Sequence, residues 1–256
     1  MKEIVKVIKE CLKITTKTKV NEKPNNYHPK TKEELQDLLK QLIEGRGNEG
    51  DFNDIDISKI TDMSDLFDGI DKFNGDISNW NVSNVKNMKN MFYGCKSFNK
   101  PLNNWDVSNV KSMKCMFYGC KSFNKDISNW DMSNVNDMNA MFFNCKSFNQ
   151  PLDNWDVSNV KNMKCMFYGC KSFNQPLDNW DVSKVTNAPY MFYCCESFNQ
   201  PLAKWNVSNV RYMIGMFHGC KSFNQDISKW DVSKVKDGND VFYNCPTEEK
   251  YKPKFK

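Results

Sequence analysis

The sequence predicts an α/β repeat solenoid of about eight turns, with one short strand and one short helix or 3-10 turn per unit and a cap at each end. Three observations predict this fold class. All seven tryptophans recur every 25 residues, from Trp80 to Trp230. Phenylalanine and cysteine keep the same step, in the columns that end at Phe223, Phe242 and Cys245. No insertion breaks this register from about residue 51 to residue 245.

The strand is expected in the first half of each unit, and the unit 98–120 illustrates it. Leu102, Trp105 and Val107 are residues that favour β structure, and Pro101 precedes them. This segment is short and apolar at what we expect to be inward positions. We therefore predict one short strand per unit there.

The helix is expected in the second half, where Met113, Met116 and Phe117 have helical spacing. Gly119 follows, and its column contains mostly glycine or asparagine, which favours a left-handed residue after a helix. Pro189 would break a helix that began at Ser183, at a cost of roughly 3 kcal/mol. It would be harmless in the first turn of a helix capped by Asn187. We therefore expect only one or two helical or 3-10 turns per unit.

The two ends depart from the repeat, and they divide the chain into four segments. Residues 1–29 form an N-terminal segment and linker, and residues 30–50 form a capping helix with Thr31 and Glu34 as a capping box. Gly45 and Gly47 end that helix. Residues 51–245 form the repeat, and residues 246–256 form a charged C-terminal tail. We expect both ends to act as caps.

Composition limits the classes of protein that the chain can represent. The hydrophobic fraction is 39% and the mean hydropathy is −0.70, yet 18 phenylalanines and 14 methionines require a core, which argues against a disordered chain. No run approaches the roughly 20 apolar residues of a membrane span. Two histidines leave little for metal or acid–base chemistry.

Three columns invite a chemical role, and each has a simpler structural interpretation. The cysteine column is better explained by small buried apolar side chains than by metal ligands, since no CxxC motif occurs. The Asp/Asn column is followed two positions later by serine, which favours an Asx-turn over a calcium site or a hydrolytic centre. The asparagine column from Asn74 to Asn224 is expected to satisfy backbone groups at a corner. The members of the Asp/Asn column are Asp56, Asn81, Asp106, Asp131, Asp156, Asp181, Asn206 and Asp231.

Charge gives no indication of nucleic-acid binding. Residues 51–245 hold equal numbers of basic and acidic residues, so the net charge of +5 belongs to the ends. A lysine column from Lys96 to Lys221 is interrupted by Glu196 and is expected to be a solvated surface. The aromatic column from Tyr93 to Tyr243 is expected to be half-buried packing between units, with a ligand platform as the alternative.

The least repetitive surface lies in the sixth and seventh units and supplies the candidate binding residues. The segments T-N-A-P-Y and R-Y-M-I-G replace the usual K-N-M-K pattern there. Exposed aromatic and aliphatic side chains are what a protein contact uses, although relaxed selection near the end of the array would also produce such variation. The candidate binding residues are Pro189, Tyr190, Arg211, Tyr212, Ile214 and His218.

The consensus unit reads F-N-x-P-L-x-x-W-D-V-S-N-V-x-x-M-x-x-M-F-Y-G-C. It resembles the repeat of about 25 to 26 residues in bacterial surface proteins and lipoproteins, a domain of unknown function that is grouped with the BspA-like leucine-rich-repeat family and found in mollicutes, Listeria and other bacteria. The segments P-K-T-K-E-E-L and I-D-I-S-K-I-T-D-M-S-D-L-F are similar to the usual opening of such arrays, so the resemblance covers roughly residues 29–245. It implies a leucine-rich-repeat-like solenoid and, often, adhesion or protein binding.

These observations predict a non-enzymatic repeat scaffold for protein–protein or surface interaction. Catalytic triads, P-loops and dinucleotide fingerprints are missing from the sequence, and we expect no cofactor and no metal. The expected partner is a protein or a ligand on a host or cell surface, not a nucleic acid, and the chain is expected to be a monomer. No signal peptide or lipobox is visible, so we expect a cytoplasmic location. Family relatives are often on the cell surface, which leaves a surface adhesin or antigen as an alternative, and a cation-binding or hydrolytic solenoid that uses the Asp column is a second.

Overall fold

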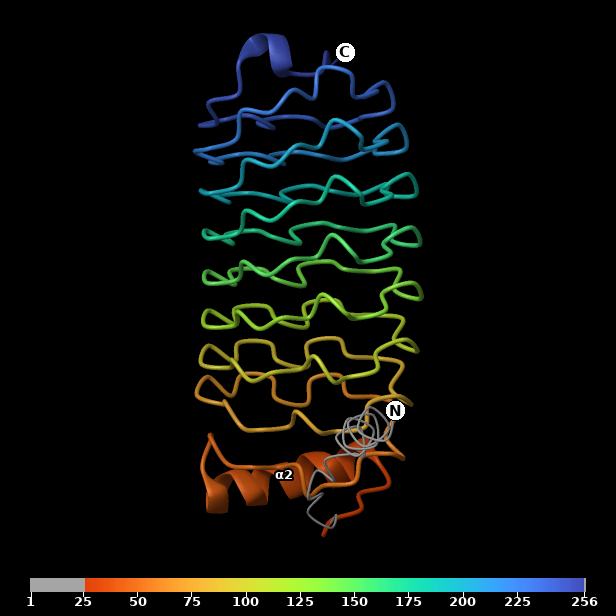
Figure 1. Cartoon of the computed structure of the whole chain (residues 1–256), viewed down its shortest axis with the longest axis vertical. Coiled ribbons are helices and arrows are strands. Elements are labelled where there is room, and N and C mark those ends of the chain that lie inside the picture. The colour runs from red at the N-terminus through yellow and green to blue at the C-terminus, as the bar shows by residue number, and fades with distance from the viewer. Residues whose placement is uncertain (1–25, 256) are drawn as a thin grey trace, which may run out of the picture.

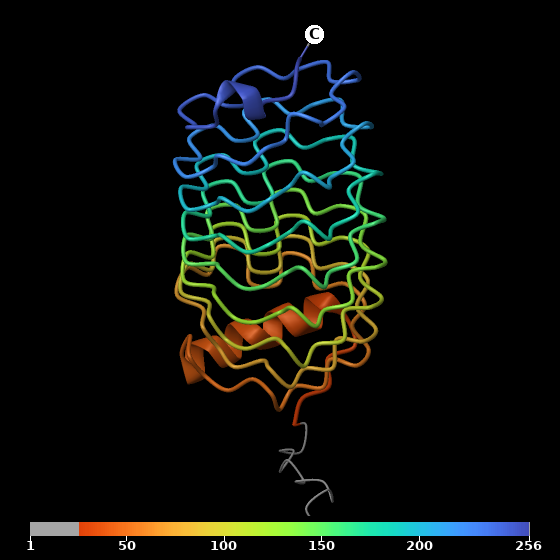
Figure 2. The same ribbon diagram turned by 45° about the horizontal axis from the view of Figure 1, so that its top comes forward.

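The computed structural model describes residues 26–255. Within them the chain forms one α-helix, α2 (Lys32–Arg46), and one short 3-10 helix, η1 (Glu249–Tyr251). Between the two, units of 25 residues lie one on another along the long axis, with α2 across one end and η1 at the other (Figures 1 and 2). Neighbouring units are joined by isolated parallel β-bridges at the same 25-residue step, such as Asn87 with Ser112. The predicted repeat is therefore present as a stack of units with few regular elements.

The helix predicted in each unit is wrong, because the backbone there forms consecutive β-turns. Met116 N–H bonds to Met113 O at 3.1 Å, and Cys120 N–H bonds to Phe117 O at 3.0 Å. The alternate N–H groups, starting from Met113, donate to carbonyls of the next unit at 2.6–3.3 Å. This division gives every second N–H a partner in the next unit, while the N–H groups of Met116, Tyr118 and Cys120 bond within turns, which a helix could not do. The spacing of Met113, Met116 and Phe117, which resembles that of a helix, results from these consecutive β-turns.

The strand predicted at Leu102, Trp105 and Val107 is also wrong. Trp105 N–H bonds to Leu102 O at 3.1 Å, and Val110 N–H bonds to Val107 O at 2.9 Å, so this half of the unit also consists of turns. The buried residues in it are mostly three apart, whereas a strand would bury every second residue. Tight turns allow these closely spaced apolar residues to point into the same interior.

Two columns of residues adopt positive φ, and the sequence predicts only one of them. The predicted column is confirmed throughout, including Gly119 at φ 74° and the poorly suited Cys194 at φ 54°. The second column contains Cys115, Ala140, Cys165 and Tyr190 at φ 52–57°. A left-handed residue in the middle of the segment is incompatible with a helix, and this is the physical reason that the helix prediction fails.

The interior consists of aromatic side chains stacked from unit to unit. Phe117 and Phe142 have ring centroids 5.7 Å apart and an interplanar angle of 5°, and Trp105 and Trp130 lie 6.5 Å apart at 2°. Each tryptophan also satisfies its indole N–H inside the core, as Trp130 Nε1 does by donating to Leu102 O at 3.0 Å. Because each unit covers the apolar side chains of the next, the stack has one continuous core.

The predicted helix near the N-terminus is confirmed as α2. Thr31 is its N-cap and accepts from Glu34 N–H at 3.2 Å, and it ends at Arg46 with Gly47 as the C-cap at φ 77°. Leu35 and Leu39 are buried against the first unit. Arg46 forms a two-bond ion pair with Asp54 of that unit, at 2.7 and 2.9 Å. The helix therefore covers the end of the apolar core.

At the other end, the segment predicted as a charged tail folds back over the last unit. Gly238 occupies the position where other units bury methionine, and the ring of Phe255 lies 2.8 Å from where a Cβ on Gly238 would be. Thr247 is buried and donates to Phe223 O at 2.9 Å. Ile227 N–H bonds to Tyr251 O at 3.0 Å. The charges of this segment lie outside, while Phe255 takes the place of the missing methionine.

Candidate functional site

The cysteine column lies inside the core, as the sequence predicts. Cys120, Cys145 and Cys170 are fully buried, and all the cysteines within residues 26–255 are free thiols. The structure adds one feature that the sequence does not show: each buried thiol donates to a backbone carbonyl of the preceding unit. Cys145 Sγ, for example, lies 2.9 Å from Phe117 O. Burial raises the pKa of the Cys145 thiol well above its ordinary value, which removes the reactive thiolate form.

The Asp/Asn column forms the Asx-turns that the sequence predicts. Ser108 N–H donates to Asp106 Oδ1 at 3.1 Å, and Ser208 N–H donates to Asn206 Oδ1 at 3.2 Å. The Ser108 hydroxyl, at 2.6 Å, is the main cause of a lowered pKa of Asp106, and the Ser108 N–H adds to it. Within residues 26–255, no three His, Cys, Asp or Glu side chains converge in a way that could hold a metal ion.

The asparagine column from Asn74 to Asn224 satisfies backbone groups, as predicted. The Oδ1 atom of each asparagine accepts from the backbone N–H of the next one, for example Asn124 Oδ1 from Asn149 N–H at 2.9 Å. At the end of the ladder, Asn224 Oδ1 accepts from Glu248 N–H at 3.0 Å. The ladder therefore joins successive units at one corner without any need for a ligand.

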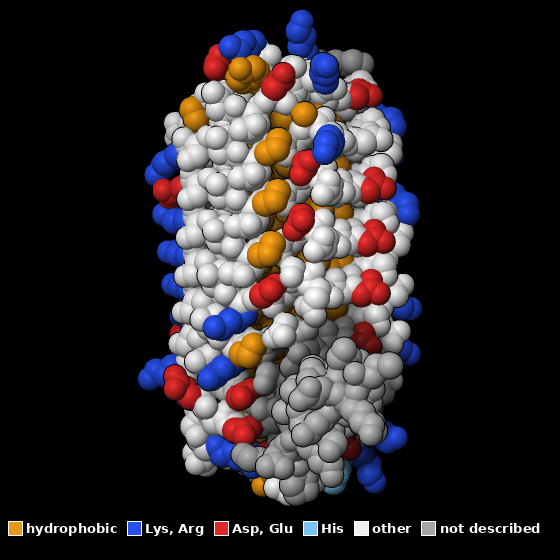
Figure 3. Space-filling view, in the orientation of Figure 1, with side chains coloured by type: hydrophobic (Ala, Val, Ile, Leu, Met, Phe, Trp, Pro, Cys, Tyr) orange, Lys and Arg blue, Asp and Glu red, His pale blue; other side chains and the backbone are white. Residues whose placement is uncertain are grey.

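The lysine column and the aromatic column lie at the surface of the stack. Glu196 contacts Lys171 at 2.6 Å and Lys221 at 3.0 Å, and hydrogen bonds from these two ammonium groups lower the pKa of Glu196. The aromatic column is half-buried, as predicted, until the exposed Tyr243, with Tyr168 and Tyr193 stacked at 4.5 Å. Stacked rings present their edges to solvent, so this column does not offer open faces to a ligand. Figure 3 shows charged side chains mainly along the two long edges, with an interrupted apolar line between them.

The six candidate binding residues occupy three different environments. Pro189 is buried, and the ring of Tyr190 lies 2.7 Å from where a Cβ on Gly215 would be. His218 is stacked between Tyr193 and Tyr243, with ring centroids 4.5 and 4.8 Å away.

Of the remaining three candidates, one is half-buried, like Tyr190 and His218, and two are exposed. Ile214 is half-buried, and its carbonyl accepts from Tyr190 N–H at 2.8 Å. Arg211 and Tyr212 are exposed, and Tyr212 keeps 44% of its surface in solvent. Of the six candidates, the structure therefore brings Arg211 and Tyr212 together on an open surface.

Arg211 and Tyr212 line an open groove of about 400 Å³ with Thr186 and Asn187 of the preceding unit. We call these four residues the Tyr212 patch. Arg211 also lines an adjoining depression of about 480 Å³, which we call the basic depression. Its residues are Lys161, Ser183, Lys184, Thr186, Asn209, Arg211 and Lys234. The candidates inferred from the sequence omitted the lysines of the basic depression, although Lys184 and Lys234 are visible as the two lysines in a column that otherwise holds asparagine from residue 84 onward.

The surfaces around Arg211 carry mainly polar and basic side chains. The side chains of the Tyr212 patch offer an aromatic ring, a guanidinium, a hydroxyl and an amide. His28 and His218 lie far from one another in the stack, since His28 contacts Asp56 at 3.4 Å and His218 belongs to the aromatic column of the seventh unit. In the part of the chain that the structure describes, no helix is both long enough and apolar enough to cross a membrane.

Comparison with known proteins places the chain in a family. No curated protein and no solved structure matches it. The family model described as Mycoplasma protein of unknown function, DUF285, matches residues 37–155 and again residues 137–254. The two matches begin at residues 37 and 137, four 25-residue units apart, so the family model itself follows the repeat. Because the matches together cover most of the sequence, the chain belongs to the DUF285 family.

Proposed function

We propose that the chain is a non-enzymatic repeat scaffold that binds another protein or a surface ligand through the Tyr212 patch. One observation carries the proposal: Tyr212 is 44% exposed and beside Arg211 in an open groove. Its column elsewhere holds Asp, Asn or Ser, such as Asn187 and Asp237 on either side of it. Tyrosine and arginine, with tryptophan, are enriched among the residues that carry most of the binding energy at protein interfaces.

The proposal includes a finer description of the fold and its relatives. We infer a leucine-rich-repeat-like solenoid of the BspA-like group. Two features support it: the parallel bridges at a 25-residue step, and the asparagine ladder in which Asn124 accepts from Asn149 N–H. An experimental structure that showed units rotating about the axis in the manner of a different repeat class would contradict this assignment.

The binding test replaces surface residues by others from the same columns, so that the stack is preserved. Tyr212→Asn introduces the residue found at position 187, and Tyr243→His introduces the residue found at position 218. Tyr243 is 56% exposed and lies outside the patch, which makes it the matched control. We expect a partner recovered by affinity capture and quantitative mass spectrometry to be lost with Tyr212→Asn and retained with Tyr243→His. Equal recovery with both variants would remove the patch from the proposal.

The cellular address of this scaffold is a separate proposal. We propose the cytoplasm, with a surface adhesin as the alternative. Protease treatment of intact cells distinguishes them, because an adhesin would be cleaved from outside and a cytoplasmic protein would be protected until lysis.

A further inference from the structure

Two lysines interrupt a hydrogen-bonded asparagine column at one edge of the stack. In most units the asparagine of this column donates to a serine carbonyl of the preceding unit, as Asn209 Nδ2 does to Ser183 O at 2.9 Å. Lys184 and Lys234 take the place of this asparagine in two units. Lys184 Nζ donates to Asn159 Oδ1 at 2.7 Å, and Lys234 Nζ donates to Asn209 Oδ1 at 2.8 Å. Each ammonium group is therefore held at the level of the preceding unit, with two more N–H donors available.

A neighbouring column supplies two further cations at those same levels. Lys161 follows Asn159 by two residues, and Arg211 follows Asn209 by two residues. Lys184 is thus paired with Lys161, and Lys234 with Arg211. The two pairs are two units apart, which is about 10 Å at the usual spacing of about 4.8 Å between adjacent parallel segments.

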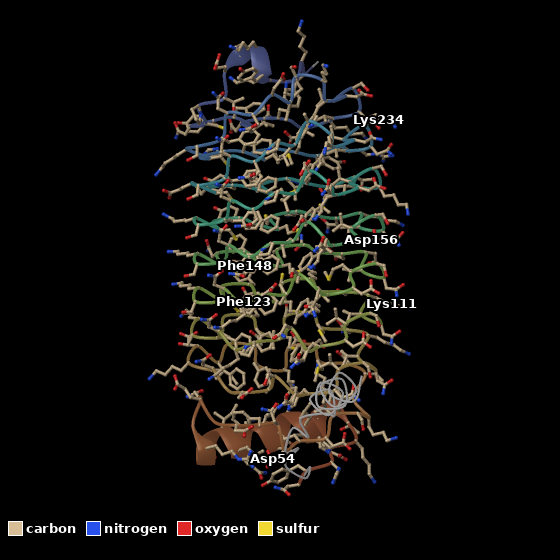
Figure 4. All side chains as sticks on the ribbon, viewed as in Figure 1. Asp54, Lys111, Phe123, Phe148, Asp156 and Lys234 are labelled. Atoms are coloured by element: carbon tan, nitrogen blue, oxygen red, sulfur yellow. The ribbon has the colours of Figure 1, made fainter. Side chains whose placement is uncertain are left out.

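The space between the cation pairs is lined by hydroxyl and amide groups. Ser183, Thr186 and Asn209 lie with the four cations around the basic depression of about 480 Å³. The Asp/Asn column beside it holds Asn206 at the level of Arg211, so one negative charge is missing there. Asp181 lies near Lys184 and uses Oδ1 to accept from Ser183 N–H. Figure 4 shows that Lys234 lies on the same edge of the stack as Lys111 and Asp156.

Three of the five lysines in the lysine column on the aromatic side, Lys96, Lys171 and Lys221, already have a carboxylate partner among the described residues. Lys171 and Lys221 are both neutralised by Glu196, at 2.6 and 3.0 Å. Among the described residues, none of the four cations of the basic depression has a carboxylate within 4.0 Å. Charge-assisted hydrogen bonds to phosphate or sulfate oxygens are the strongest contacts that such groups make.

We propose that the basic depression binds a compact ligand that carries two phosphate or sulfate groups about 10 Å apart. Each anionic group would contact one cation pair, and the hydroxyl groups of Ser183 and Thr186 would face the part that joins them. A long nucleic acid fits less well, because the repeat has equal numbers of basic and acidic residues and this run of cations spans only a few units.

The direct test is calorimetric titration of the full chain at low salt with hexane-1,6-diyl bisphosphate, the corresponding bis-sulfate, and propyl phosphate. If both cation pairs act together, the bisphosphate or the bis-sulfate binds at least about tenfold more tightly than the monophosphate. Comparison of the bisphosphate with the bis-sulfate distinguishes a phosphate ligand from a sulfate ligand. A short single-stranded oligonucleotide that binds more tightly than both would overturn the proposal in favour of nucleic acid.

Variants taken from the repeat itself show where the ligand binds. The double variant with Lys184→Asn and Lys234→Asn restores the asparagine of the column. We expect it to weaken binding of whichever compound binds more tightly, the bisphosphate or the bis-sulfate, at least about fivefold. Lys111→Asn is the control, because its column already holds Asn136 and it lies on the same edge outside the depression. Thermal melting checks that both variants fold, and Lys184→Gln with Lys234→Gln serves if the asparagine variant does not. The proposal would be overturned if the double lysine variant and the control bound that compound with equal affinity, or if the intact chain bound neither compound.

The basic depression shares Thr186 and Arg211 with the Tyr212 patch, but the two proposals can be tested separately. Tyr212→Asn leaves all four cations in place, so we expect it to abolish partner capture without changing the affinity for the bisphosphate or the bis-sulfate. Partner capture that survives Tyr212→Asn would contradict the proposed function alone, whereas absence of bisphosphate and bis-sulfate binding by the intact chain would contradict this site alone.

Discussion

In the central units, residues 98–172, each column holds nearly the same residue type from one unit to the next, whereas the irregular units, residues 183–219, break several columns at once. Ala188 replaces a buried methionine, Tyr190 occupies a position with positive φ, and Tyr212 stands where other units have Asp, Asn or Ser. The backbone is nevertheless the same in both regions. Cys165 N–H bonds to Pro189 O at 2.9 Å, as Cys115 N–H bonds to Asn139 O at 2.8 Å.

This difference teaches that the stack depends on main-chain bonds and buried volume, and leaves the outer side chains free to vary. Pro189 illustrates the point, because it has no N–H to donate. In a central unit the equivalent N–H, that of Asn139, donates only to a side chain, Asp137 Oδ1, at 2.9 Å. The proline therefore removes no bond between units.

The largest expected effect tests whether the core is equally tight in the two regions. Phe142→Ala and Phe192→Ala each remove a fully buried ring whose next neighbour in the stack lies 5.7 and 5.6 Å away, respectively. We expect each substitution to lower the free energy of unfolding by about 3–5 kcal/mol, measured by guanidinium denaturation. A loss at Phe192 smaller by more than about 1 kcal/mol would show that the irregular units are packed less well.

The next effect tests how Tyr190 is accommodated. Gly215 has φ 57°, and an added Cβ would lie 2.7 Å from the Tyr190 ring, although Ala140 occupies the equivalent position of a central unit. We expect Gly215→Ala to destabilise the intact chain by about 2 kcal/mol, and the Tyr190→Ala chain by less than about 1 kcal/mol. The measurement is a double-mutant cycle by denaturation. Equal losses in both backgrounds would mean that the backbone, and not the tyrosine ring, requires glycine there.

A smaller effect of opposite sign is expected at Ala188. It lines an internal cavity of about 10 Å³ with Met163, Met191 and Met213, at the position where most units place a methionine. We expect Ala188→Met to fill this space and raise stability by about 0.5–1 kcal/mol. Thermal and guanidinium denaturation measure it, with Ala203→Met at an exposed position as the control. A loss of stability would show that the neighbouring side chains have already closed the space.

The sequence predicted the repeat, the buried columns and the polar ladders because each of these depends on residue type alone. It could not predict the local backbone, because Met113, Met116 and Phe117 are spaced as they would be in a helix. The decisive feature is positive φ at Cys115, Ala140 and Tyr190, which are residue types that give no sign of it. The packing of Phe255 could not be predicted because it involves Gly238, where the sequence shows only a departure from the repeat.

The candidate site was predicted in part for a similar reason. Departures from the repeat identified Arg211 and Tyr212, which are exposed. They also identified Pro189, which is buried, because a linear pattern does not show which of several neighbouring substitutions faces outward. Lys184 and Lys234 were missed because lysine is common throughout the chain, and their shared level with Lys161 and Arg211 depends on how the units stack.

The smallest expected effect concerns stability in acid. In the Asp/Asn column, the central units hold the carboxylate of Asp106, whereas the irregular units hold the uncharged amide of Asn206. The pKa of Asp106 is lowered by the Ser108 hydroxyl and N–H, so its folded-state pKa lies below the ordinary value of about 3.9. A depressed carboxyl pKa contributes stability above the unfolded pKa, and this contribution is lost as pH falls through the folded pKa. Asn206 makes the equivalent turn with Ser208 N–H at 3.2 Å without a titrating group.

Exchanging these two residues should therefore move the acid sensitivity from one region to the other. We expect Asp106→Asn to leave stability at pH 7 nearly unchanged and to make its decline below about pH 4 shallower, and Asn206→Asp to make that decline steeper. Each change should be below about 1 kcal/mol, because both side chains are exposed. Urea denaturation at intervals from about pH 2 to about pH 7 measures the slopes. If stability declined with the same slope below pH 4 in the unmodified chain and in both variants, the Asx-turns would hold the stack equally well with a protonated carboxyl group.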